Sequence, residues 1–196
     1  MTFRPLAFAA TLALTLSACG NSTSSSDSTA NPLDTATEFV VNPIEWKACD
    51  GSTSTEVECG NIEVPFDYSD PEQGSFVLYV KKHNASKPAN RIGSMMVNPG
   101  GPGFGGSSLA DDAQYYFSQD LIDNFDIIAW DPRGTGESTP AVDCVDTYDE
   151  YFGLDSPPET PDEKQALIDA SQAFNDKCEE NSGTILPYIS TKASAQ

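Results

Sequence analysis

Basic residues are scarce in this chain. Its 196 residues include 10 Lys and Arg against 30 Asp and Glu, which gives a formal net charge of −20. Nucleic-acid binding rests on cationic side chains that neutralise phosphates, so the composition argues against a nucleic-acid partner and, equally, against an anionic membrane surface. The ten Phe, seven Tyr and two Trp argue against wholesale disorder, because disordered chains contain few large apolar residues. We therefore expect a mostly folded, acidic protein.

Histidine and closely spaced cysteines are scarce as well. His83 is the single histidine, and no Cys-x-x-Cys pair occurs. Zinc sites draw on clustered Cys and His residues, so the sequence offers little support for a metal centre. His83 lies at the end of a predicted strand, where we expect its side chain to be exposed.

No apolar run is long enough to span a membrane. The longest apolar stretch covers residues 6–16, whereas a transmembrane helix needs about 20 residues. With one basic residue before it and small residues after it, this stretch predicts a signal peptide over residues 1–18.

The residues that follow predict a membrane anchor of another kind. Leu16-Ser17-Ala18-Cys19 resembles the lipobox of bacterial lipoproteins, which implies a lipid on Cys19 and a location on the outer face of the bacterial cell membrane. Residues 19–43, rich in Ser and Thr, would then form a flexible tether. The alternative is an ordinary signal peptide with an incidental cysteine.

Four further cysteines remain after Cys19, namely Cys49, Cys59, Cys144 and Cys178. An exported chain meets an oxidising environment, so two disulfides are expected. Three connectivities are possible. The sequential one, Cys49 with Cys59 and Cys144 with Cys178, closes the shortest loops and is the pairing we expect.

Hydrophobic patterning predicts an α/β fold over residues 44–196. Residues 57–68 and 75–82 have strand character and flank a turn at residues 70–74, which predicts a hairpin. Residues 91–97 and 125–130 are nearly continuous apolar runs, typical of parallel strands covered on both faces.

An amphipathic helix is expected between the last two strands. Apolar residues recur there at spacings of three and four over residues 107–121: Leu109, Ala113, Tyr116 or Phe117, and Leu121. Strand, helix and strand would form one right-handed crossover unit.

A second helix is predicted inside a strongly acidic segment, residues 141–180. Thr160, Pro161 and Glu163 form a capping box with proline at the first helical position. An apolar stripe follows, made of Leu167, Ala170, Phe174 and Cys178. From residue 143 to residue 180 there are twelve acidic residues and two lysines. Such a segment is either a solvated face or a surface that attracts cationic substrates such as free peptide amines.

A glycine-rich motif, residues 98–106, follows the strand at 91–97 and could serve three purposes. Residues 101–106 satisfy the dinucleotide pattern G-x-G-x-x-G, but Pro102 removes a donor and an exported protein rarely meets free NAD. A phosphate-binding P-loop would need a lysine after the glycines, and none is present. The third use is an oxyanion hole built from backbone N–H groups.

A second motif, Asp131-Pro132-Arg133-Gly134-Thr135-Gly136-Glu137-Ser138, favours the oxyanion hole. Together with residues 99–103 and 49–68, it resembles the α/β-hydrolase fold family, and within it the exported tripeptidyl and prolyl aminopeptidase-like serine peptidases. The resemblance implies a mostly parallel sheet with an antiparallel amino-terminal hairpin. It also implies serine hydrolysis of peptide or ester substrates without any cofactor.

The resemblance assigns roles to the glycine-rich motif and the turn after residue 130. Gly101 is the expected oxyanion donor through its backbone N–H, and Gly100 and Gly103 would shape the loop. Asp131, Arg133, Gly134 and Gly136 would form a structural turn, with the guanidinium of Arg133 paired to a carboxylate.

The catalytic triad of that family has no counterpart in these residues. No Gly-x-Ser-x-Gly nucleophile motif occurs, and His83 precedes every motif although the family's histidine follows them. We therefore expect a truncated amino-terminal half of a hydrolase fold, inactive without its missing carboxy-terminal half and left with an unpaired strand edge prone to aggregation. The rival interpretation is a non-catalytic surface lipoprotein or a degenerate hydrolase fragment.

Overall fold

A computed structural model describes residues 39–40, 42–51 and 54–195, which belong to the compact unit Ala36–Gln196. The predicted signal peptide, Cys19 and nearly all of the predicted tether lie outside the described residues. Among the helices that are described, none has the length and hydropathy needed to cross a membrane.

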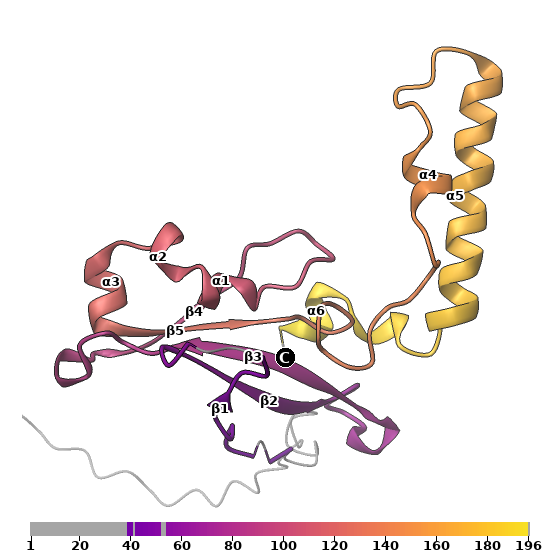
Figure 1. Cartoon of the computed structure of the whole chain (residues 1–196). Helices are drawn as coiled ribbons and strands as arrows, with labels where there is room; N and C mark the ends of the chain where they lie inside the picture. The colour runs from indigo at the N-terminus through magenta and orange to yellow at the C-terminus, as the bar shows by residue number, and fades with distance from the viewer. Residues whose placement is uncertain (1–38, 41, 52–53, 196) are drawn as a thin grey trace, which may run out of the picture. The chain divides into compact units, whose positions relative to one another are not determined.

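The described residues form a five-stranded mixed sheet (Figure 1). Its strands run in the order β1-β2-β3-β5-β4. Only β4 and β5 pair in parallel, whereas the other three pairings are antiparallel. The α/β class is confirmed, but the expectation of a mostly parallel sheet does not hold for the described part. The strands are β1 (Lys47–Ala48), β2 (Val57–Pro65), β3 (Ser75–His83), β4 (Gly93–Val97) and β5 (Phe125–Trp130).

The predicted hairpin is confirmed in β2 and β3, which pair from Val57 opposite His83 to Pro65 opposite Ser75. A short 3-10 helix, η2 (Pro71–Gln73), forms the turn. Beyond the hairpin, Phe66 packs edge-on against Phe76, with ring centroids 4.7 Å apart, and stacks on Tyr188 at 5.3 Å. These contacts join the carboxy-terminal residues to the hairpin.

His83 is buried, not exposed as predicted. Its side chain is only 7% exposed because β3 continues through it, between Val57 of β2 and Ile127 of β5. In the part of the chain that the structure describes, its Nδ1 has no hydrogen-bond partner.

Three short helices, not one, connect β4 to β5. They are α1 (Ser108–Asp111), α2 (Ala113–Tyr116) and α3 (Gln119–Asn124), and Figure 1 shows them along one face of the sheet. The predicted single helix is wrong because Phe117 and Ser118 are extended. This break lets Phe117 and Ile122 pack in one core cluster with Ala113 and Ile127.

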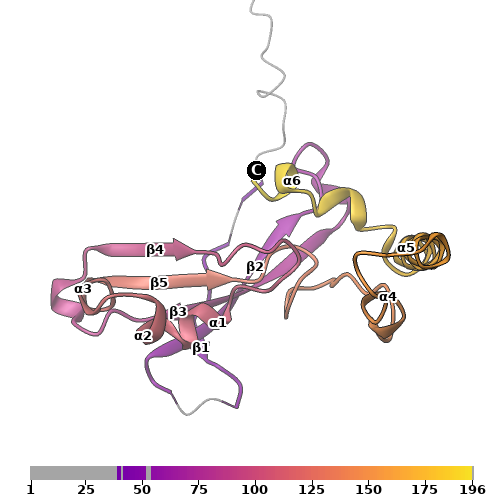
Figure 2. The same cartoon turned by 90° about the horizontal axis from the view of Figure 1, so that it is seen from above.

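β4 is an edge strand in the described part of the sheet (Figure 2). Its residues alternate between half-buried and exposed, and Met96 is 68% exposed. The prediction that this strand is covered on both faces is therefore wrong. β5 lies between β3 and β4, and its Ile127 and Ala129 are fully buried.

The acidic segment contains α4 (Asp149–Phe152) and the long helix α5 (Pro161–Ser182), followed by η4 (Leu186–Tyr188) and α6 (Thr191–Ser194). The predicted capping box of Thr160 and Glu163 is present. Both predicted disulfides are confirmed, Cys49 with Cys59 and Cys144 with Cys178. The second ties the start of the segment to α5.

Candidate functional site

The two sequence motifs meet at one edge of the sheet. In the parallel pair, Val97 at the end of β4 lies opposite Ala129 near the end of β5. The glycine-rich loop, residues 98–106, and the turn at residues 131–138 therefore start side by side, as Figure 2 shows for the ends of the two strands. Ligand sites in α/β sheets form at this carboxyl end.

Asp131 connects the loop to the turn. Its side chain is only 2% exposed. One carboxylate oxygen accepts the N–H of Ser107 at 2.8 Å, and the other accepts the N–H of Glu137 at 2.9 Å. A carboxylate that accepts backbone N–H groups makes charge-assisted hydrogen bonds. Asp131 thus holds the last residues of the loop and the turn in one arrangement.

Two glycines make room for this carboxylate. A Cβ at Gly105 would lie 2.6 Å from Oδ1 of Asp131, and a Cβ at Gly136 would lie 2.3 Å from its Oδ2. Gly136 also has φ +55°, a conformation that side chains disfavour. Gly134, with φ +76°, turns the chain beside Val142 and Ile189. The structural roles expected of these turn residues fit this geometry.

Ser138 attaches the turn to β3. Its hydroxyl donates to the backbone carbonyl of Asp131 at 2.6 Å and accepts the N–H of Tyr79 at 2.9 Å. The N–H of Asp131 in turn donates to the carbonyl of Tyr79 at 2.9 Å. Because Ser138 is fully buried and both bonds use its hydroxyl, it is a structural residue.

The prediction that Arg133 pairs with a carboxylate is wrong, because Arg133 forms no ion pair among the residues that the structure describes. Its Nη1 donates to the backbone carbonyls of Phe66 at 2.9 Å and Tyr188 at 3.3 Å. Its guanidinium also lies 5.8 Å from the ring centroid of Tyr68 and 5.4 Å from that of Phe76, within the range of cation–π attraction. Burial lowers the pKa of Arg133. The residue joins the turn to the hairpin and to η4.

The outer part of the loop is exposed and leaves a donor free. Gly100 donates its N–H to Oδ1 of Asn98 at 2.7 Å. Within the described residues, the N–H of Gly101 has no hydrogen-bond partner, and Gly101 itself is exposed. Gly100, Gly101 and Gly103 have φ values of +82°, +142° and +93°, so the loop depends on glycine at these positions.

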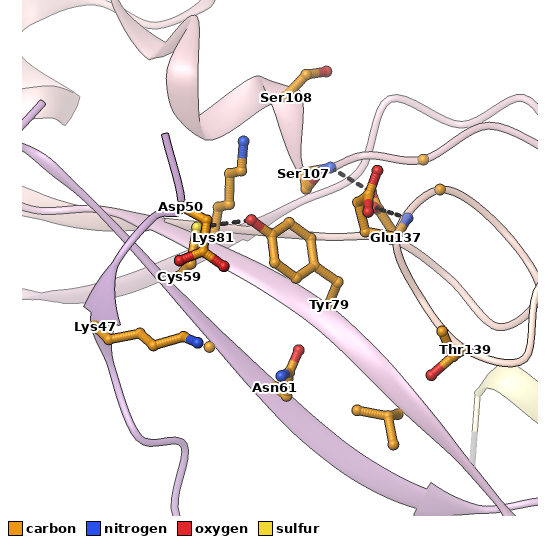
Figure 3. Close-up of a pocket in the computed structure, with 15 residues that line it drawn as sticks. Lys47, Asp50, Cys59, Asn61, Tyr79, Lys81, Ser107, Ser108, Glu137 and Thr139 are labelled. Atoms are coloured by element: carbon orange, nitrogen blue, oxygen red, sulfur yellow. Dashed lines mark hydrogen bonds between the residues drawn. The ribbon is translucent and has the colours of Figure 1, made fainter. Parts of the chain in front are cut away.

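A pocket of about 770 Å³ lies beside the base of the loop. Figure 3 shows Tyr79 at its wall, and the hydroxyl of Tyr79 lies 2.8 Å from Sγ of Cys59. Burial raises the pKa of Tyr79. Lys81, on the same strand, pairs with Asp111 at 2.6 Å. The sequence patterns did not identify this lining, because alternate residues of a hairpin become neighbours of the loop only in the folded sheet.

The pocket lining contains Ser107 and Ser108 but no histidine. A serine needs an adjacent base to act as a nucleophile, and His83, the single imidazole, is buried in the sheet. Over the ranges that the structure describes, no group of three His, Cys, Asp or Glu side chains could hold a metal ion. Among the described residues, the pocket therefore brings two serines close to the glycine-rich loop without a histidine beside them.

Sequence comparison with known proteins relates the chain to hydrolases. No family model matches the chain. It is 31% identical over 162 residues to a tripeptidyl aminopeptidase of Streptomyces coelicolor, covering 78% of the chain and 29% of that protein. It is 33% identical over 108 residues to serine protease Hip1 of Mycobacterium tuberculosis, covering 52% of the chain and 20% of that protein.

A third relative has an esterase name. Carboxylesterase B of Mycobacterium tuberculosis is 35% identical over 105 residues, covering 50% of the chain and 20% of that protein. The chain is related to hydrolases of the serine peptidase and esterase type. It spans less than a third of the length of these relatives.

Proposed function

We propose that this chain carries the oxyanion loop of an aminopeptidase-like serine hydrolase, which releases short peptides or residues from substrate amino termini. The observation that carries the proposal is that the N–H of Gly101, an exposed residue, has no hydrogen-bond partner among the described residues, while Asp131 holds the base of its loop. A preorganised donor of this kind stabilises the negative oxygen of a tetrahedral intermediate. Gly100 and Gly103 give the loop its shape.

The chemistry would follow the serine hydrolase scheme. A serine hydroxyl loses its proton to a histidine and attacks the substrate carbonyl, whose oxygen becomes negatively charged. The N–H of Gly101 and the N–H after the nucleophile would hold this oxygen. In this proposal residues other than these 196 supply the nucleophile, the acid and the histidine. The loss of one oxyanion donor typically costs about 2.7–4 kcal/mol of transition-state stabilisation.

The related tripeptidyl aminopeptidase supports a peptide substrate, whereas the related carboxylesterase supports an ester as the second candidate. An unblocked tripeptide p-nitroanilide, its N-acetylated form and p-nitrophenyl butyrate separate the two. An aminopeptidase cleaves the unblocked anilide and spares the acetylated one. An esterase cleaves the butyrate fastest and makes no distinction at the amino terminus.

The gene beyond the Gln196 codon supplies a direct test. We expect an in-frame Gly-x-Ser-x-Gly motif followed by a later histidine. In the protein so encoded, Gly101→Ala forces a side chain onto φ +142° and should lower kcat by about ten-fold or more. Gly93→Ala is the matched control, since nothing lies within 4 Å of its Cβ.

A fluorophosphonate probe tests the chain itself. The 196-residue polypeptide should remain unlabelled, because the described pocket places no histidine beside Ser107 or Ser108 and the nearby carboxylate of Asp131 already accepts backbone N–H groups. Labelling that disappears in one serine variant would contradict the assignment. If the gene instead holds a stop codon directly after Gln196, a non-catalytic surface lipoprotein becomes the better interpretation.

The proposed location is the outer face of the cell membrane, with a lipid on Cys19. The two disulfides support an oxidising compartment. Cys19→Ser should release the protein from the membrane fraction and abolish incorporation of labelled palmitate. Retention of the label in that variant would exclude Cys19 as the attachment site.

A further inference from the structure

The acidic segment carries an aromatic surface that is partly open to solvent. Tyr148, Tyr151, Phe152 and Phe174 form one cluster, with neighbouring ring centroids 4.9 to 6.0 Å apart. Phe152 is 71% exposed and Tyr148 is 50% exposed. Exposed apolar side chains that gather in this way mark interaction surfaces more often than single ones do.

Four carboxylates next to these rings in the chain, called the acidic rim here, have no cationic partner among the described residues. Asp146, Asp149, Glu150 and Asp155 lie within four residues of Tyr148 or Phe152 and are all exposed. Among the residues that the structure describes, none of these four carboxylates forms an ion pair. The cation–π contacts among the described residues all involve rings outside the acidic segment, namely those of Trp46, Tyr68, Phe76 and Tyr79.

The surface is held in place before any partner arrives. The disulfide between Cys144 and Cys178 joins the chain before α4 to α5, and Figure 1 shows α4 lying against α5. Asn181 donates to the carbonyl of Cys144 at 3.0 Å, and the hydroxyl of Ser182 donates to the carbonyl of Asp143 at 3.0 Å. A fixed surface binds more tightly because less conformational entropy is lost.

We propose that the aromatic rings of Tyr148 and Phe152, with the acidic rim, bind a cationic peptide segment whose Arg or Lys side chains lie over the rings. The acidic rim selects a positively charged partner, and the open ring faces favour guanidinium or ammonium groups. The inference goes beyond the proposed hydrolase activity, because such binding needs no nucleophile.

Fluorescence anisotropy of a labelled probe tests the proposal on the full chain. The probe is an acetylated and amidated nonapeptide of alternating arginine and glycine, which no aminopeptidase can cleave, so hydrolysis does not enter the result. We expect saturable binding that weakens with added salt, as for partly exposed charges. A matched peptide with glutamate in place of arginine should not bind.

Paired variants locate the site. Tyr148→Ala with Phe152→Ala should weaken probe binding by about ten-fold, the combined effect of two exposed cation–π contacts. Tyr115→Ala with Tyr116→Ala removes two rings that are 78% and 64% exposed but lie outside both the acidic segment and the glycine-rich loop. This control should change the affinity less than two-fold.

A double substitution of two carboxylates gives a result that does not depend on the rings. Asp149→Asn with Glu150→Gln should weaken binding and flatten its salt dependence, whereas Glu45→Gln with Glu72→Gln should do neither. Equal losses in both charge pairs would overturn the proposal, since they would indicate diffuse attraction by the net charge. Absence of saturable binding by the unaltered chain would overturn it as well.

Discussion

One buried carboxylate, that of Asp131, determines how the two loops of the candidate site lie relative to each other. Its two oxygens accept hydrogen bonds from the backbone N–H groups of Ser107 and Glu137. The main chain of Asp131 is hydrogen-bonded to the carbonyl of Tyr79 and the hydroxyl of Ser138. A neutral side chain of the same shape cannot accept both N–H groups, because an amide has one carbonyl oxygen.

We therefore predict that Asp131→Asn lowers the free energy of unfolding by about 1.5–3 kcal/mol, the range for hydrogen bonds to charged groups. Urea unfolding followed by circular dichroism measures the change. Glu72→Gln, an exposed carboxylate without a contact to the loops, is the control and should stay within about 0.5 kcal/mol of the unaltered chain. Equal stability of the two variants would show that the bridge is dispensable.

The close packing of Gly136 against Asp131 leads to a second prediction about stability. Gly136→Ala and Gly51→Ala both place a side chain on a positive φ, +55° and +72°, which costs on the order of 1–2 kcal/mol. Among the described residues nothing lies within 4 Å of a Cβ at Gly51, whereas a Cβ at Gly136 meets the carboxylate of Asp131 at 2.3 Å. Gly136→Ala should therefore be clearly the more destabilising of the two in urea unfolding, and equal losses would contradict the close packing.

Residue types predicted which positions matter but not all of their partners. The turn glycines, Gly134 and Gly136, and Asp131 follow from the motif at residues 131–138. The partners of Arg133 were predicted incorrectly, because the carbonyls of Phe66 and Tyr188 come from segments 67 and 55 residues away. His83 was placed on the surface for the same reason, since its burial depends on the neighbouring strands β2 and β5.

At the scale of elements, α3 is joined to the segment before β4 by one carboxylate. Asp123 accepts hydrogen bonds from Lys87, Ser86 and Gln119. The hydrogen bond from Lys87 is the largest of the effects that lower the pKa of Asp123 to about 2 from its usual value of 3.8. The folded state therefore favours the ionised form of this side chain.

The sign of the pH dependence follows from that pKa. Asp123 contributes its full stabilisation above pH 3.8, and the contribution is lost as the pH falls through 2. Asp123→Asn should flatten the loss of stability between these values, as measured by urea unfolding at a series of pH values. Asp120→Asn, on the same helix, is the control. An unchanged acid profile in Asp123→Asn would contradict this assignment.

The sequence predicts the elements whose residue pattern is local, but not those whose bounds depend on tertiary packing. The β2–β3 hairpin, the parallel pair β4–β5 and the capped helix α5 all follow from alternation, apolar runs or a capping box. The prediction of a single crossover helix is wrong. The apolar pattern at residues 107–121 is continuous, but Phe117 and Ile122 can pack in the core only because the helix breaks at Phe117 and Ser118. Tertiary packing overrode periodicity there.

The sheet that the structure describes ends in β4, which has a strand partner on one side only. Ile92 and Met96 are 71% and 68% exposed at this edge. Open apolar edges invite pairing with another chain.

We predict that the 196-residue chain self-associates as its concentration rises and that Met96→Lys reduces the association, because an edge charge opposes strand pairing. Sedimentation velocity over a concentration series measures both. Ile168→Lys on α5, which replaces an apolar side chain that is 50% exposed, is the control and should leave association unchanged. A monomer at every concentration would argue against an available edge.

Amide hydrogen exchange, resolved by residue with NMR on the 15N-labelled chain, measures whether the N–H of Gly101 is available to a substrate oxygen. We predict that this N–H exchanges nearly as fast as in an unstructured peptide, because it has no hydrogen-bond partner among the described residues. The N–H of Ser107, held by Asp131, should be slowed by roughly a hundred-fold or more. Protection of Gly101 comparable to that of Ser107 would mean that its donor is bound within the protein, and the oxyanion assignment would be wrong.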